Sequence, residues 1–187
     1  MYGEKMEDIL LDLENGEICI AGGSVVGMVL SIVNSLVTYI SNLTLRKKKY
    51  EDIKPQVEEI LKEAQELKVK AIKIIDQDKI TLEEILKAYK KRKNDEETYQ
   101  RVLKNAVEFC MDVLKSSFDT YKLVERISNV GNEMLESDFR ICKHYAIASV
   151  KSAIENVRIN LIGINDIEYK NIIKKKCNRG LQELDLS

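Results

Sequence analysis

The sequence predicts an all-α protein, a single-domain, largely antiparallel bundle of long helices over residues 1–187. Apolar residues recur at three- and four-residue steps along almost the whole chain, which is the spacing of one helix face. Only one proline and eight glycines occur, so few positions disfavour a helix. The hydrophobic content of 44% is sufficient for one domain with a sizeable core.

Capping and breaking signals set the expected helix boundaries. We expect a first helix over residues 4–14 that stops at Asn15-Gly16, and a second from Ser24, its predicted N-cap, to Arg46. A break is expected at Ser116-Ser117. The remaining helices are expected at residues 54–76, 81–91, 96–116, 118–128, 132–163 and 166–177.

The helix expected at residues 24–46 is the least charged part of the chain. It approaches the ~20 apolar residues that span a bilayer. Small and polar residues interrupt it every three or four positions, namely Ser31, Asn34, Ser35, Thr38, Ser41 and Asn42. Such a stripe lets another helix approach closely, within the monomer or across a dimer, or lines a narrow cleft. We therefore expect no membrane association.

Composition bounds the possible partners and the location of the protein. Thirty basic and thirty-one acidic residues leave a net charge of -1, so no global charge favours nucleic acid. The cysteines are widely spaced and show no paired metal-ligand pattern: Cys19, Cys110, Cys142 and Cys177. With no secretory leader recognised, they indicate reduced thiols in the cytoplasm. His144 is the single histidine, so we expect no metal site.

Two separated stretches carry polar clusters where a helical protein would otherwise place core residues. The first is Ala21-Gly22-Gly23-Ser24, leading into the helix that ends in Asn42-Leu43-Thr44-Leu45-Arg46-Lys47-Lys48-Lys49-Tyr50. The second runs from Gly131-Asn132-Glu133 through Ser137-Asp138 to Asn156-Val157-Arg158-Ile159-Asn160-Leu161. Polar groups inside a core are costly unless they have partners or a task, so both stretches supply candidate site residues.

On these residues the chain resembles the cyclodeaminase/cyclohydrolase family, which includes the C-terminal domain of formiminotransferase-cyclodeaminase and stand-alone methenyltetrahydrofolate cyclohydrolases. Its members carry a P-G-G-G-S loop, an N-L-T-x-G-K-K-K-Y segment, and a G-N-x-x-x-x-S-D stretch leading into N-V-x-x-N-L. The resemblance covers nearly the whole chain. It fails at Ile20, where the family has proline, at Ala21, which replaces the first glycine, and at Arg46, which replaces the glycine before the lysines.

The resemblance implies a helical homodimer that hydrolyses methenyltetrahydrofolate to formyltetrahydrofolate, with no cofactor beyond the tetrahydrofolate substrate. It places the folate near the Gly-Gly-Ser loop and the Ser-Asp helix. Two alternatives stay open: a formiminotetrahydrofolate cyclodeaminase, which releases ammonia, and a non-catalytic dimeric helical module. Alanine tolerates a positive φ far less readily than glycine, so Ala21 is expected to disturb the loop conformation and with it the usual way of holding the folate ring.

Asp138 is the predicted catalytic residue. A carboxylate near the cationic one-carbon bridge of the substrate stabilises its charge and acts as general base toward water. Seven further residues are predicted to bind the substrate: Gly22, Gly23, Ser24, Lys47, Lys48, Asn132 and Ser137. The glycines and Ser24 offer backbone donors at a helix start, and the lysines attract the glutamate tail of folate. Asn132 and Ser137 flank the ligand or cap a helix.

A geometric argument limits which residues can share one pocket. In one unbroken helix Asp138 and Asn156 lie ~27 Å apart, so they cannot contact the same reacting carbon. Either the helix breaks, or Asn156 and Asn160 have a structural role, or they meet a site that a second subunit helps to form. We favour the structural role, in which Asn156 and Asn160 tie their helix to a neighbour.

Overall fold

The computed structural model describes residues 2–15 and 21–185, which form six α-helices and two short 3₁₀ helices. The α-helices are α1 (Tyr2–Glu14), α2 (Gly22–Leu45), α3 (Lys54–Lys91), α4 (Glu96–Val130), α5 (Glu136–Leu161) and α6 (Ile167–Asp185). The 3₁₀ helices are η1 (Lys48–Ile53) and η2 (Glu133–Leu135). The predicted all-α class is confirmed.

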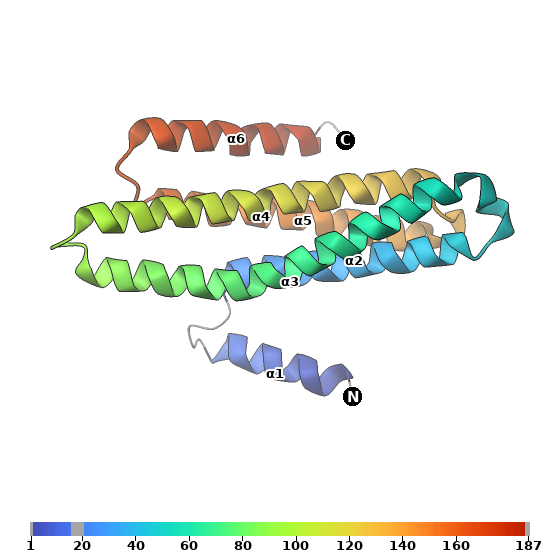
Figure 1. Ribbon diagram of the computed structural model, residues 1–187, viewed down its shortest axis with the longest axis horizontal. Coiled ribbons are helices and arrows are strands. Elements are labelled where there is room, and N and C mark those ends of the chain that lie inside the picture. Colours follow the sequence, from blue (N-terminus) through green and yellow to red (C-terminus); the bar gives the residue numbers. More distant parts are fainter. Residues whose placement is uncertain (1, 16–20, 186–187) are drawn as a thin grey trace.

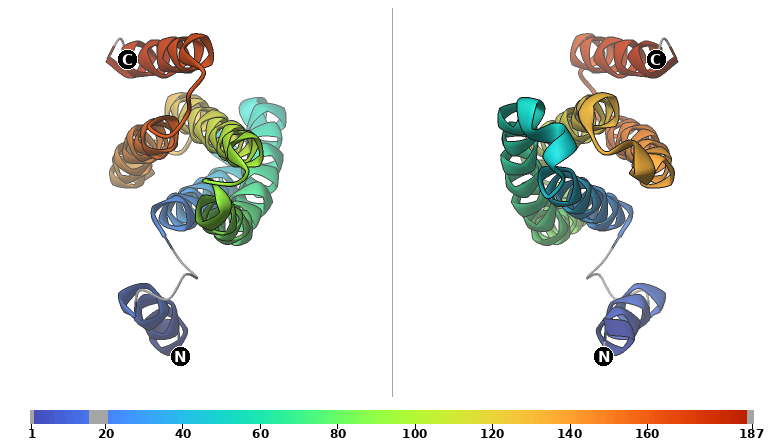
Figure 2. Two further views of the ribbon diagram at one scale, coloured as in Figure 1. Left: turned by 90° about the vertical axis from the view of Figure 1, so that its left-hand side faces the viewer. Right: turned by 90° about the vertical axis from the view of Figure 1, so that its right-hand side faces the viewer.

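Helices α2 to α5 form an elongated antiparallel four-helix bundle (Figure 1). Helix α2 packs mainly against α3 and α4 mainly against α5, whereas the seam between α2 and α5 is more sparsely packed. Helix α6 lies outside the bundle on one side, and α1 lies on the opposite side (Figure 2). The sparse α2–α5 seam leaves parts of both helices open to solvent.

Two predicted helix breaks are wrong. Helix α3 runs without interruption through residues 76–81, where two helices were expected. Helix α4 continues through Ser116 and Ser117, which are both buried. Their hydroxyls donate to the carbonyl oxygens of Asp112 and Val113, each at 2.9 Å, so the serines satisfy themselves within the helix instead of ending it.

The closing helix also runs further than expected. Helix α6 continues to Asp185, beyond the predicted end near Cys177, and Leu184 in its last turn is buried. Burial of an apolar side chain in that turn explains the extension, since tertiary packing stabilises helical turns more than local propensity does.

Helix α2 supplies one wall of the core through Leu30, Val33, Val37 and Ile40, which are almost fully buried. The buried polar residues of its stripe bond to carbonyls of the preceding turn, as Ser41 does to Val37 at 2.9 Å. This arrangement confirms that part of the stripe serves close packing within the monomer, because a satisfied hydroxyl is cheap to bury.

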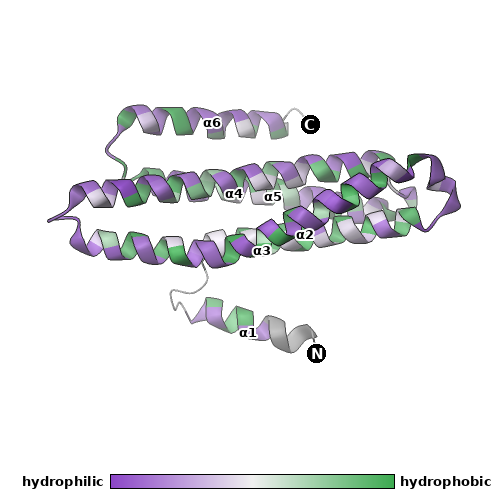
Figure 3. Cartoon of the chain, in the orientation of Figure 1, coloured by the Kyte–Doolittle hydropathy of each residue, from purple (hydrophilic) through white to green (hydrophobic). Residues whose placement is uncertain are grey.

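The outward face of α2 is unusual for a surface helix, because the whole helix contains no charged residue (Figure 3). Ile32 is 53% exposed and Tyr39 is 48% exposed. By length and composition alone, α2 is long and apolar enough to cross a membrane, while half of its most apolar window is buried inside the bundle. Helix α2 therefore has one face in the core of the bundle and one apolar face that nothing in the described part of the monomer covers.

Candidate functional site

The two motif stretches meet at the end of the bundle where α2 leads into η1. The backbone N–H of Asn132 donates to Thr44 Oγ1 at 3.0 Å. Lys47 Nζ and the backbone N–H of Met134 each donate to Asn132 Oδ1 at 3.2 Å. The hydroxyl of Tyr50 lies 3.5 Å from the same oxygen. We call Thr44, Lys47, Tyr50 and Asn132 the asparagine end.

Asn132 is the centre of this cluster and is only 3% exposed. Its bond to Met134 caps η2, so the predicted capping role is confirmed. On the surface beside it, Lys49 and Glu133 form an ion pair at 2.6 Å. The hydrogen bond from Lys49, followed by its charge, lowers the pKa of Glu133, and the same contact raises the pKa of Lys49.

The other predicted residues of this end lie nearby on α5 and η1. Ser137 and Lys48 are exposed, and Asp138 is half-buried in the first turn of α5. Among the described residues, the carboxylate of Asp138 has no hydrogen-bond or ion-pair partner. Burial, followed by the charge of Asp138, raises the pKa of the Cys142 thiol one turn later to about 12. A half-buried carboxylate without a partner is available to a ligand.

The glycine end lies at the opposite end of α2 and comprises Gly22, Gly23, Ser24 and Asp78. The predicted N-cap role of Ser24 is wrong, because α2 begins at Gly22 and Ala21 holds the N-cap position without a side-chain cap. Ser24 is fully buried instead. The backbone N–H of Ser24 donates to Asp78 Oδ2 on α3 at 2.8 Å, and the Ser24 hydroxyl donates to the same oxygen at 2.9 Å.

Gly23 is required by this contact. A Cβ at Gly23 would lie 2.0 Å from Asp78 Oδ1, so any side chain would displace the carboxylate. Gly22 differs, since its Cβ would lie 3.4 Å from Asn156 Oδ1, an ordinary contact distance. The glycine pair therefore serves close approach, and the strict requirement falls on Gly23 alone.

The departures from the family pattern introduce no backbone strain where the structure describes them. Ala21 has a φ of -133° in extended backbone, and Arg46 has a φ of -75° in the right-handed region. Both conformations are open to any residue, so the expectation that Ala21 endangers the loop through a positive φ is wrong. Ile20 lies outside the described residues.

A groove of about 530 Å³ runs along the α2–α5 seam from the glycine end toward the middle of the bundle. Its walls are mostly apolar or small: Gly22, Val25, Val26, Val29, Tyr145, Ala148, Ser149, Ser152, Glu155 and Asn156. We call it the α2–α5 groove. Its size and apolar walls suit a flat organic ligand with a few polar groups.

Asp138 shares the helix face that lines this groove but lies beyond its end. Tyr145 and Ser152 follow Asp138 at seven-residue steps, which place all three on one face of α5. Asp138 is ~10 Å further along the axis than Tyr145 and ~27 Å from the level of Asn156. Because α5 is unbroken, one chain does not bring Asp138 to the glycine pair.

Asn160 has the structural role that the spacing favoured. Its side-chain Nδ2 donates to the carbonyl oxygen of Asn156 at 2.8 Å and to Cys110 Sγ on α4 at 3.4 Å. This contact ties α5 to α4. Asn156 instead lines the α2–α5 groove beside Gly22, so the two asparagines do not act alike.

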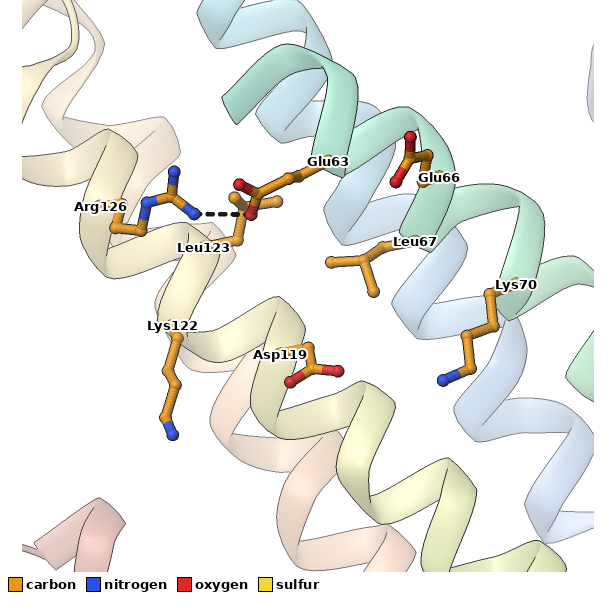
Figure 4. A pocket seen from close by; sticks show the side chains of 8 residues that line it. All are labelled: Glu63, Glu66, Leu67, Lys70, Asp119, Lys122, Leu123 and Arg126. Carbon is orange, nitrogen blue, oxygen red and sulfur yellow. Dashed lines mark hydrogen bonds and ion pairs between the residues drawn. The ribbon is translucent and has the colours of Figure 1, made fainter. Parts of the chain in front are cut away.

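A second groove, of about 520 Å³, lies between α3 and α4 (Figure 4). Three acidic and three basic residues surround two leucines there: Glu63, Glu66, Asp119, Lys70, Lys122, Arg126, Leu67 and Leu123. Arg126 pairs with Glu63 at 2.6 Å and with Glu59 at 3.5 Å. Charges of both signs face water and offset one another, and no predicted site residue lines this groove. The α2–α5 groove is therefore the better candidate site.

Sequence reasoning missed two residues of the candidate site, Asp78 and Tyr145. Asp78 lies among many charged residues of α3, and its partner Ser24 is 54 positions away, so no local signal distinguishes it. Tyr145 had a signal in its seven-residue spacing from Asp138, which places it on the same face of α5.

Comparisons with known proteins find relatives by sequence and by structure. The family model described as formiminotransferase-cyclodeaminase matches residues 5–179. A methenyltetrahydrofolate cyclohydrolase from Methylorubrum extorquens is 25% identical over 170 residues, covering 87% of this chain and 82% of that relative. The solved structure of a formiminotetrahydrofolate cyclodeaminase from Thermotoga maritima has a TM-score of 0.80 at 29% identity, covering 91% of this chain and 83% of that chain.

The fold and the motif positions define a helical bundle of the cyclodeaminase/cyclohydrolase type, with a core helix that begins in glycines and leads to a buried asparagine. The chain belongs to the formiminotransferase-cyclodeaminase family, whose model covers most of its length. The resemblance inferred from the motifs is thereby confirmed.

Proposed function

We propose that this protein hydrolyses methenyltetrahydrofolate to formyltetrahydrofolate. The observation that carries the proposal is Asp138, a half-buried carboxylate without a partner among the described residues, on the α5 face that lines an apolar groove. The family and the relative named as a methenyltetrahydrofolate cyclohydrolase support the choice of substrate.

The proposed chemistry needs one carboxylate close to the one-carbon bridge. Methenyltetrahydrofolate carries a delocalised cation over two nitrogens and the bridging carbon. Water adds to that carbon and gives up a proton to the Asp138 carboxylate. The proton then passes to one nitrogen, whose bond to the carbon breaks. The hydroxyl on that carbon releases its proton to solvent as the carbonyl forms, so the formyl group stays on the other nitrogen and one proton is released overall. The negative charge of Asp138 also stabilises the cation before attack.

A homodimer resolves the separation between Asp138 and the glycine end. We place the uncovered faces of α2 and α5 against those of a second copy in antiparallel orientation, as a two-fold interface permits. The glycine end of one subunit then lies opposite Asp138 of the partner subunit. The ~27 Å between the levels of Asp138 and Asn156 along one α5 then separates the two equivalent sites of the dimer.

Three features of the uncovered face favour such a partner. Helix α2 has no charged residue to desolvate. Ile32, Tyr39 and Tyr145 are about half exposed and offer apolar area at the seam. The hydroxyl of Ser35 on this face donates to the carbonyl oxygen of Ser31 at 2.7 Å. A partner subunit that covers Ser35 therefore does not leave its hydroxyl without a hydrogen bond.

Sedimentation of wild type and Ile32→Lys tests the homodimer. A lysine at this position would bury a charge in the interface, so we expect a dimer for wild type and a monomer for the variant. Ile72→Lys is the matched control, because Ile72 is similarly exposed on α3. A monomeric wild type, or equal effects of the two substitutions, would contradict the interface.

The lysines at the asparagine end supply the cationic part of the proposed site. Lys48 is exposed, and Lys47 is exposed while holding Asn132. We propose that they attract the glutamate tail of the folate, whose carboxylates are negative at neutral pH. Ser137, exposed beside Asp138, is a proposed contact for the same ligand.

Hydrolysis is tested by following the ultraviolet chromophore of methenyltetrahydrofolate against the rate in buffer. We expect wild type to accelerate its loss and Asp138→Asn to lower kcat by about 100-fold or more. Asp119→Asn is the control, since Asp119 is a half-buried aspartate of α4 that lines the other groove. No acceleration by wild type would defeat the proposal.

The second candidate is formiminotetrahydrofolate cyclodeaminase activity, which the similarity to the Thermotoga maritima structure favours. It passes through the same bridged cation by ring closure and loss of ammonia. Ammonia release from formiminotetrahydrofolate without hydrolysis of the methenyl compound would identify it. Failure to bind either folate would instead indicate the non-catalytic helical module.

We also propose a cytoplasmic location. Cys110, Cys142 and Cys177 are free and buried, as reduced structural thiols are. Burial is the main cause that raises the pKa of each thiol, which keeps them protonated and unreactive. Cys19 lies outside the described residues. Fractionation of cells that express the tagged protein tests this location.

A further inference from the structure

We infer that Asp78 is a positioning residue of the glycine end and that its carboxylate determines which part of the ligand this end receives. The inference rests on the proposed function, because it concerns how a folate lies in the α2–α5 groove. Asp78 does not line the groove, and it acts through Gly23 and Ser24.

Three contacts join α3 to the start of α2. Asp78 Oδ2 accepts both the backbone N–H and the hydroxyl of Ser24. Asp78 Oδ1 occupies the space where a Cβ of Gly23 would be. The hydroxyl of Ser24 also lies 3.3 Å from the carbonyl oxygen of Ile75, one turn before Asp78. The first turn of α2 is thus fixed by another helix and not by a cap of its own.

This arrangement changes the charge that the glycine end presents. A free helix N-terminus carries a partial positive charge and attracts anions. Here a full negative charge is bonded within the first turn, so it offsets the helix dipole. Asp78 therefore makes the glycine end unfavourable for the anionic glutamate tail and favourable for the cationic one-carbon bridge.

The charge of Asp78 acts beyond its own contact. Burial and then this charge raise the pKa of the Cys110 thiol on α4 to about 12. At the far end of α2, Lys47 and Lys48 are exposed cations, whereas Lys49 is paired with Glu133. In the proposed dimer, the lysines of one subunit lie near the glycine end of the other. The shared site therefore carries charges of both signs, which orients a ligand whose bridge is cationic and whose tail is anionic.

The charge effect is tested with Asp78→Asn, which keeps an oxygen acceptor for Ser24 and removes the charge. The substrate has a cationic bridge and the product, formyltetrahydrofolate, a neutral one. We expect the KM for methenyltetrahydrofolate to rise about fivefold and the inhibition constant of the product to change less than about twofold. A purely structural role would change both alike or neither, and either result would overturn the inference.

Asp76→Asn is the matched control, because Asp76 is an exposed aspartate of the same helix, two residues before Asp78. The control should leave both constants unchanged. If wild type fails to hydrolyse the substrate, the proposed function fails, and calorimetric binding of the two folates still compares their affinities for wild type and Asp78→Asn. Equal losses for both folates would then reject the inference.

The positioning role is tested by a second pair of variants. Gly23→Ala should lower the thermal midpoint strongly, because its Cβ meets the Asp78 carboxylate. In an Asp78→Ala background the same substitution should cost far less, since the obstructing atoms are gone. If Gly23→Ala is equally damaging in both backgrounds, Asp78 does not position the glycine end.

Discussion

The two ends of α2 bury polar groups in opposite ways. At the glycine end a carboxylate of α3 presses against Gly23, and the contact exists because a side chain is missing. At the asparagine end several donors converge on Asn132, and the contact exists because a side chain is present. The first contact tolerates no added atom at Gly23, and the second tolerates no lost atom at Asn132. Substitutions that add or remove atoms should therefore separate the two ends.

Gly23→Ala should have the largest effect on stability. Its Cβ would lie 2.0 Å from Asp78 Oδ1, so the carboxylate must move away from the fully buried Ser24. Overpacking and a lost charged hydrogen bond together should lower the free energy of unfolding by about 2–4 kcal/mol. Urea denaturation measures the change. Gly22→Ala is the control: its Cβ would make only an ordinary contact, and alanine favours a helix more than glycine, so the free energy of unfolding should stay within about 1 kcal/mol of wild type. Equal losses for the two variants would remove the distinction between the glycines.

Asn132→Ala should have the next largest effect, because it removes the acceptor shared by Lys47 and the N–H of Met134. Loss of this cap and of a buried acceptor should lower the free energy of unfolding by about 1–2 kcal/mol. Asn132→Asp keeps the oxygen and adds a charge beside Lys47, so its cost in urea denaturation should be smaller. If the two variants lose the same stability, the amide oxygen is not the centre of this end.

The Lys49–Glu133 ion pair should have the smallest effect, because both side chains are mostly exposed. The contact lowers the pKa of Glu133, so its contribution is present above the ordinary value of 4.5 and is lost as the pH falls through the lowered value. Thermal unfolding of wild type and Glu133→Gln should differ slightly at neutral pH and converge in acid. If the stability difference between wild type and Glu133→Gln grew as the pH fell, the ion pair would not be its source.

The fold class followed from the sequence because helical periodicity is a local property that repeats over many turns. The errors within it came from tertiary context. Ser117 suggested a break, yet its hydroxyl bonds to Val113 inside an unbroken α4. Ser24 suggested a cap, yet it is held by Asp78 from another helix. Residues that favour helix ends in isolation behave differently when a neighbouring helix supplies packing or a partner.

The site was predicted by residue type but not by arrangement. Motif spacing singled out Asp138 and Gly22, and the unbroken antiparallel course of α2 and α5 places them at opposite ends. The ~27 Å distance followed from helix geometry, but its consequence for the site depends on how the helices pack. Asp78 had no signal at all, because its role arises from a contact between distant segments.

The central claim is that each site combines the glycine end of one subunit with Asp138 of the partner subunit. Its most direct test mixes two inactive variants, Asp138→Asn and Gly22→Leu, after confirming that each is folded and dimeric. Gly22→Leu fills the glycine end of the groove without displacing Asp78. Unfolding and refolding them together at equal amounts should restore about a quarter of the wild-type rate, because half of the dimers are mixed and hold one intact site. No recovery from fully mixed dimers would contradict the shared site.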